Sequence, residues 1–164
     1  MSQSEKNLKE AFAGESQANR KYLAFAKKAD QEGYAAAARL FRAAAAAETI
    51  HAHNHLRALN AIGSTADNLA EALAGETHEF KNMYPAMIES AREEGDKKAE
   101  RTFHYANEVE KVHAALYQKA LDDLDHLEPM DYYVCPLCGY TAEKEPPEKC
   151  PVCGARRESF FKVD

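Results

Sequence analysis

Apolar residues recur every three or four positions along most of the chain, which is the spacing of one face of an α-helix. The pattern predicts four long helices, which run from about Ser4 to Gln31, from Tyr34 to Ile62, from the segment 64–67 to Gly95, and from Asp96 to about Leu124. Four helices of this length with one apolar stripe each predict an all-α four-helix bundle.

The predicted helices have recognisable ends. Ser2 or Ser4 can cap the first helix, because a serine hydroxyl accepts a hydrogen bond from a free backbone amide. Gly33 is expected to close the first helix and Gly63 the second, since glycine tolerates the left-handed conformation common there. Pro85 should kink the third helix, because its ring collides with the carbonyl four residues back.

Two copies of a Glu-x-x-His motif interrupt the apolar stripes, at Glu48 to His51 and at Glu110 to His113. Residues three apart project from the same helix face, so each motif offers a carboxylate and an imidazole to a single point. One such motif is common by chance as a surface pair. Two copies, both on apolar stripes, favour metal ligands.

The two motifs belong to an internal repeat. The segment AFAGES of the first half recurs as ALAGET in the second, which pairs Glu15 with Glu76 ahead of the two motifs. Glu79 breaks the symmetry, because Ala18 stands at the corresponding position of the first half. The sequence therefore predicts two related helical hairpins, of which the second carries an additional carboxylate.

These inward-facing residues predict a site for two metal ions. Buried unpaired charges are costly, and two divalent cations would offset most of five carboxylates. A set of carboxylates and imidazoles without thiolate suits iron or manganese, and helical bundles with two metals use this ligand pattern. The predicted ligands are Glu15, Glu48, His51, Glu76, Glu79, Glu110 and His113.

Further polar residues lie near the stripes. Tyr22 and Tyr84, each a turn or two beyond a ligand, can donate hydrogen bonds to ligating carboxylates, with core packing as the alternative interpretation. The remaining histidines with a weaker claim are left outside the ligand set, namely His53, His55, His78 and His104.

The C-terminal tail has a different pattern. After a polar joint, short strands surround two CPxCG motifs, so we expect a helical domain over 1–128 and a β-rich metal domain over 129–164. The two motifs bring four thiolates around one ion, through Cys135, Cys138, Cys150 and Cys153. The ion can be structural zinc or a single redox-active iron.

Composition narrows the functional class. The chain has 164 residues, of which 45% are hydrophobic and 29% charged, and no apolar run approaches the roughly 20 residues of a membrane span. A net charge of -6 argues against nucleic acid as a partner. The N-terminus lacks the apolar block of a signal peptide, so we expect a cytoplasmic protein with metal-bound rather than disulfide-bonded cysteines.

Taken together, these motifs resemble the rubrerythrin family over essentially the whole chain. The resemblance rests on AGES, AGETHEF, ETIH, EKVH, MYP, CPLCGY and CPVCGA. It implies a ferritin-like di-iron domain joined to a rubredoxin-like domain, acting as a peroxidase that reduces hydrogen peroxide to water. It also implies a homodimer, head-to-tail or helix-swapped, and an electron-donating reductase or rubredoxin-type carrier.

The resemblance also implies roles for the ligands. Glu48 and Glu110 would bridge the two irons, Glu15 would bind one iron, and Glu76 with His113 would bind the other. The remaining two ligands, Glu79 and His51, would exchange on the first iron as the site changes redox state.

Three functions compete at this point. The leading hypothesis is a peroxidase that receives its electrons through the four-cysteine iron site. The second is a ferroxidase that oxidises and sequesters iron, as ferritin-like proteins do. The third makes the bundle a scaffold and the tail a structural zinc ribbon that serves as an interaction module.

Overall fold

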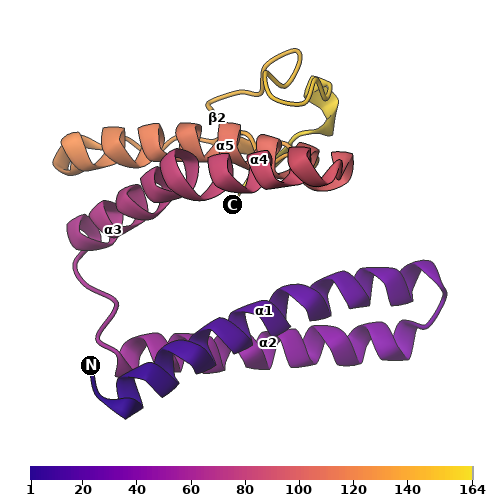
Figure 1. The fold of residues 1–164 in the computed structure, drawn as a ribbon, viewed down its shortest axis with the longest axis vertical. Coiled ribbons are helices and arrows are strands. Elements are labelled where there is room, and N and C mark those ends of the chain that lie inside the picture. Colours follow the sequence, from indigo (N-terminus) through magenta and orange to yellow (C-terminus); the bar gives the residue numbers. More distant parts are fainter. Residues whose placement is uncertain (164) are drawn as a thin grey trace. The chain divides into compact units, whose positions relative to one another are not determined.

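The structure, a computed structural model, describes residues 1–163 and contains two compact units, the first over 1–63 and the second beginning at Ser64. The first unit is a helical hairpin (Figure 1). The second combines two further long helical segments with a three-stranded sheet. The predicted class is confirmed: the chain is mostly helical, with four long helical segments and a small β-rich C-terminal domain. Over residues 1–163, no helix is both long and apolar enough to span a bilayer.

The hairpin of the first unit joins α1 (Gln3–Gln31) to α2 (Ala35–Ala58). Its buried positions are occupied by small side chains, namely Ala26, Ala29, Ala38, Ala45 and Ala52. Methyl groups let the two backbones approach so closely that Asn19 Nδ2 donates to the Ala45 carbonyl at 2.7 Å. The alanine-rich sequence of α2 therefore serves close helix packing.

The start of α1 and the turn after it match the sequence prediction. The Ser2 hydroxyl accepts from the Glu5 amide at 3.1 Å and caps α1. Gly33 takes a φ of 82°, and the Tyr34 amide beyond it donates to the Ala29 carbonyl at 2.8 Å. These bonds satisfy carbonyl groups that would otherwise be free at the helix end.

The end of α2 differs from the prediction, because the helix stops at Ala58 and does not continue to Ile62 and Gly63. Asn60 adopts a left-handed conformation with a φ of 53°, and the Ala61 amide donates to the Leu56 carbonyl at 3.0 Å. Asparagine tolerates this conformation better than most residues, so it ends the helix before the glycine is reached.

The third helical segment is divided into three parts. It begins with α3 (Thr65–His78), passes through the π-helical turn η1 (Glu79–Met83) and continues as α4 (Tyr84–Glu94). Pro85 occupies the first turn of α4, directly after the π-helical turn, and its ring nitrogen has no hydrogen to donate to the helix. The interruption predicted at Pro85 is thus a wide turn that begins at Glu79.

The last long helix, α5 (Lys97–Asp122), contacts both α3 and α4. The Asp96 carboxylate caps it by accepting from the amides of Lys98 and Ala99, each at 3.0 Å. A short helix, η2 (Leu124–His126), follows it and leads into the C-terminal domain.

The C-terminal domain contains a sheet with the strand order β2-β1-β3, in which both neighbouring pairs are antiparallel. The strands are β1 (Tyr132–Val134), β2 (Thr141–Glu143) and β3 (Phe161–Val163), and the short helix η3 (Arg157–Ser159) precedes β3. Strand β2 contacts α5, so the small domain lies against the helix that carries the second Glu-x-x-His motif.

Candidate metal centres

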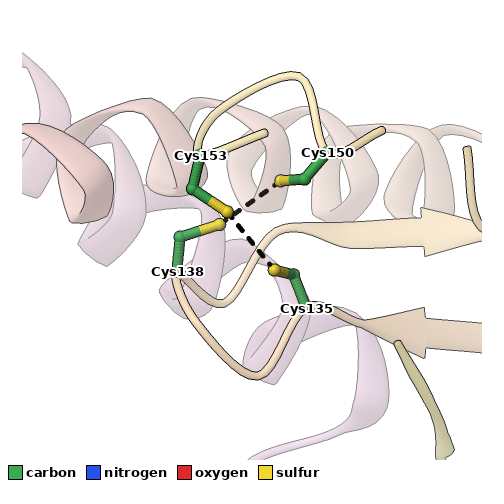
Figure 2. Close-up of side chains that lie close together, drawn as sticks. All are labelled: Cys135, Cys138, Cys150 and Cys153. Atoms are coloured by element: carbon green, nitrogen blue, oxygen red, sulfur yellow. Dashed lines mark hydrogen bonds between the residues drawn. The ribbon is translucent and has the colours of Figure 1, made fainter. Parts of the chain in front are cut away.

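Four cysteine thiols from two loops of the C-terminal domain point toward one another (Figure 2). The Sγ atoms of Cys135 and Cys153 are 3.6 Å apart, and those of Cys138 and Cys150 are 3.5 Å apart. All four sulfurs lie within 4.8 Å of one another. A cluster of four thiols is the donor set of a tetrahedral zinc or iron site.

The two loops are built in the same way. The Gly139 amide donates to the Cys135 carbonyl, and the Gly154 amide donates to the Cys150 carbonyl, each at 2.9 Å. The two glycines have φ angles of 88° and 76°, a region that residues with a side chain rarely adopt. Each CPxCG motif therefore needs its glycine to close the turn.

The thiols of this cluster differ in acidity. Burial raises the pKa of Cys138. Burial acts in the same direction on Cys150, but hydrogen bonds from the backbone amides of Cys153 and Val152 and from the neighbouring thiols together outweigh it, and the pKa of Cys150 is lowered. Crowded thiolates repel one another, so full ionisation of the cluster requires a cation, and the donor set fits one metal ion.

A first carboxylate and histidine cluster lies within the α1 and α2 hairpin. His51 Nδ1 is 2.9 Å from Glu48 Oε2 and 3.9 Å from Glu15 Oε1. The three residues can each place one ligand atom within 4.8 Å of the others. The predicted repeat thus brings a lone Glu from one helix to the Glu-x-x-His motif of the next.

A second cluster lies within the second unit, between α3 and α5. His113 Nδ1 is 2.8 Å from Glu110 Oε2 and 3.7 Å from Glu76 Oε1. Its composition matches that of the first cluster, and its ligand atoms also lie within 4.8 Å of one another. The two clusters therefore have the same plan, each within its own unit.

The second cluster is electrostatically strained. Burial, followed by repulsion from Glu110, raises the pKa of Glu76 to about 7. The hydrogen bond to Glu110 raises the pKa of His113. A cation here would replace the protons that these groups otherwise hold, so the donor set fits a divalent metal of the iron or manganese class.

Glu79 and Tyr84 lie close enough to the second cluster for its charged groups to shift their pKa values. Burial and then Glu110 raise the pKa of Glu79, whereas His78 and His113 lower it. Burial and three carboxylates, of which Glu79 acts most strongly, raise the pKa of Tyr84. Tyr84 therefore keeps its phenolic proton beside the acidic residues.

Tyr22 occupies a different environment in the first unit. Its ring lies 6.3 Å from that of Phe41 and 6.4 Å from that of Phe25. These contacts agree with the packing interpretation considered for Tyr22, while hydrogen bonding to a ligand stays a prediction.

Sequence reasoning missed Thr141, which approaches the second cluster from β2. Its Oγ1 lies 3.1 Å from Nε2 of His113. A threonine in a short strand is typical of any sheet, and this one lies 28 positions from the histidine in the chain, so no local pattern could have identified it.

The comparisons with known proteins match the helical part and the C-terminal part of the chain to two separate family models. The model of the rubrerythrin family matches residues 6–121, and the model of the rubrerythrin rubredoxin-like domain matches residues 133–161. Together the two matches cover all four cysteines and both Glu-x-x-His motifs.

Individual relatives match over nearly the whole chain. Rubrerythrin-2 of Clostridium acetobutylicum is 42% identical, over 93% of this chain and 92% of that protein. Nigerythrin of Nitratidesulfovibrio vulgaris is 40% identical, over 94% of this chain and 83% of that protein. A solved structure of fully reduced, all-ferrous nigerythrin aligns with a TM-score of 0.61 at 38% identity, covering 99% of this chain and 88% of that one.

Proposed function

The chain belongs to the rubrerythrin family, and from this premise we propose that it is a non-haem di-iron peroxidase that reduces hydrogen peroxide to water. The observation that carries the proposal is that the chain contains two clusters of equal composition, each with two carboxylates and one histidine, and also a cluster of four thiols. We assign one iron to each carboxylate cluster and one iron to the cysteines.

The two kinds of cluster suit different tasks. Oxygen and nitrogen ligands leave iron open to a small oxygen-containing substrate, whereas four thiolates enclose a metal and favour electron transfer. Bound iron would supply the two electrons that, with two protons, convert one hydrogen peroxide into two waters. The cysteine site would return electrons received from an external reductase or a rubredoxin-type carrier.

Residues of the protein itself donate hydrogen bonds near the site and position the ligands of the metals. Tyr84 is held protonated by its surroundings and offers a hydrogen-bond donor beside the carboxylates of the second cluster. Glu79 stands at the start of the π-helical turn, where the wider backbone differs from that of a regular helix. This placement supports the proposal that Glu79 and His51 are the exchanging ligands and that the other five are permanent.

A cavity of about 440 Å³ within the second unit supports substrate access. Its wall includes Glu76, His113 and Thr141 together with apolar side chains such as Leu116 and Tyr117. Hydrogen peroxide is small and uncharged, so such a passage can admit it to the ligand atoms without a dedicated charged pocket.

The domain division is part of the proposal. We assign the di-iron function to residues 1–128 and the electron-transfer function to residues 129–164, a division supported by family matches that end at 121 and begin at 133. We also propose a homodimer, which native mass spectrometry can test.

The decisive experiment is a stopped-flow comparison of oxidants. Iron-loaded protein that has been reduced anaerobically is mixed with hydrogen peroxide or with air-saturated buffer, and the oxidation of the iron is followed by absorbance. Faster oxidation by peroxide supports the peroxidase. Oxidation no faster by peroxide than by air would refute it, and storage of many irons per chain in a large shell would indicate a ferritin-like function.

A further inference from the structure

Two residues of the C-terminal domain contact α5, and their spacing along the extended chain matches the spacing of their partners along the helix. Gly139 stands opposite Val109, whose Cγ1 would be 3.7 Å from a Cβ at the glycine, and Thr141 stands opposite His113 at 3.1 Å. Two residues of extended chain span about 6.6 Å, and four residues of helix span about 6 Å. The segment that follows Cys138 can therefore run along α5 and place the Thr141 hydroxyl on the histidine ring.

The hydrogen bonds of Thr141 have a defined direction. Its hydroxyl donates to the Gly139 carbonyl at 3.2 Å, so the oxygen is left to accept a hydrogen bond from the Nε2–H group of His113 at 3.1 Å. The other ring nitrogen, Nδ1, faces Glu110 and Glu76. A neutral histidine that binds a metal through Nδ1 must carry its proton on Nε2. Thr141 accepts the hydrogen bond that this Nε2–H group donates.

The histidine of the first cluster lacks this support within its own unit. His51 makes the same contact to its neighbouring Glu, but the 1–63 unit supplies no hydrogen-bond partner for its Nε2. Its side chain is 54% exposed, against 28% for His113. The two clusters are alike in composition, but within its own unit only the imidazole of His113 has a hydrogen-bond partner at Nε2.

We propose that Thr141 is a positioning residue for His113, through which the cysteine domain strengthens metal binding at the cluster of Glu76, Glu110 and His113. The hydroxyl fixes the ring orientation and keeps the proton on Nε2. The proposal rests on the metal-binding role assigned to His113 above. Removal of such an outer hydrogen bond typically weakens metal binding by about 10- to 100-fold.

The test uses Mn²⁺ as the probe and the full chain with its cysteine site already filled with zinc. Free Mn²⁺ is measured by electron paramagnetic resonance during titration of wild type, Thr141→Val and Thr141→Ser. Valine keeps the shape and loses the hydroxyl, whereas serine keeps the hydroxyl. We expect about 10- to 100-fold weaker binding at one site for Thr141→Val, and wild-type binding for Thr141→Ser.

Lys119→Ala is the matched control, because the bond from Lys119 Nζ to Glu143 Oε1, at 2.7 Å, also joins α5 to β2 without touching the histidine. This variant should bind Mn²⁺ like wild type. Wild-type binding by Thr141→Val, or equal weakening by Thr141→Val, Thr141→Ser and Lys119→Ala, would overturn the proposal. If wild type and His113→Ala bind Mn²⁺ equally, the metal-binding role itself fails, which is a separate result.

Discussion

His113 Nδ1 lies 2.8 Å from Oε2 of Glu110, one helical turn earlier on α5. The corresponding atoms of His51 and Glu48 on α2 are 2.9 Å apart, so the two Glu-x-x-His motifs have the same local geometry. Their surroundings differ, because His113 is the less exposed of the two and contacts a third element through Thr141. We therefore expect substitution of His113 and substitution of His51 to have different effects on metal binding.

Substitution of the two histidines should have different effects on iron binding. His113→Ala should weaken iron binding by more than about 100-fold in both redox states, since even outer partners of a ligand are worth 10- to 100-fold. His51→Ala should leave the oxidised site largely assembled and impair only the reduced state. Iron content after desalting, measured for oxidised and anaerobically reduced samples, checks both. Equal losses for both variants in both states would contradict the prediction.

The stability of the metal-free protein should fall as pH rises. The pKa of Glu76 is raised from 4.5 to about 7 by burial and Glu110, so the folded state binds more protons than the unfolded state between these values. The raised pKa of His113 acts in the same direction, because its stabilisation is lost as pH rises through the folded pKa. Thermal unfolding between about pH 5 and pH 8 should show this decline.

Glu76→Gln identifies the source of the decline. Glutamine imitates the protonated acid, so the variant should melt like wild type near pH 5 and several degrees above it near pH 8. Glu71→Gln, at an exposed position of the same helix, is the control and should preserve the wild-type pH dependence. An unchanged pH dependence in Glu76→Gln would show that Glu76 does not titrate in this range.

Cys138→Ser should separate the two kinds of metal centre. The variant loses one of four thiol ligands, so the oxidised protein should lose the red colour of a tetrathiolate iron while the carboxylate clusters keep their iron. Visible absorption and iron analysis measure the two outcomes together. Leu137→Ser, at the 64% exposed neighbouring position, should remain red. A colourless wild-type protein that contains zinc would instead favour the structural ribbon.

Asp96→Ala should destabilise the protein without affecting either kind of metal centre. The Asp96 carboxylate accepts from two amides at the start of α5, and loss of such a cap costs about 1 kcal/mol. For a domain of this size that corresponds to a fall of about 2 to 4 °C in Tm. Asp96→Asn should retain most of the stability, because asparagine caps equally well. Glu93→Ala, an exposed change near the end of the preceding helix, should leave Tm nearly unchanged.

Much of the candidate site could be predicted from local spacing. A Glu and a His three residues apart on a helix must share a face, and the structure places both pairs at hydrogen-bond distance. The two CPxCG motifs likewise contain the glycine that each turn requires. The approach of Glu76 to Glu110 and His113 followed from the internal repeat, which indicated that two hairpins share one plan.

Two local features of the backbone were not predicted from the sequence. Asn60, rather than Gly63, ends α2, because several residues near a helix end can adopt the left-handed conformation and the sequence does not rank them. The π-helical turn at Glu79 inserts a wider turn that apolar periodicity does not reveal.

The sequence by itself determined the four helices, the two Glu-x-x-His pairs and the two CPxCG motifs, because each depends on a pattern that repeats or closes over a few neighbouring residues. Only the tertiary structure decided that β2 lies along α5 and that Thr141 reaches Nε2 of His113. The physical reason is that a hydrogen bond between segments 28 residues apart requires a particular docking of strand on helix, which no local pattern encodes. The two matching motifs thereby acquire different surroundings.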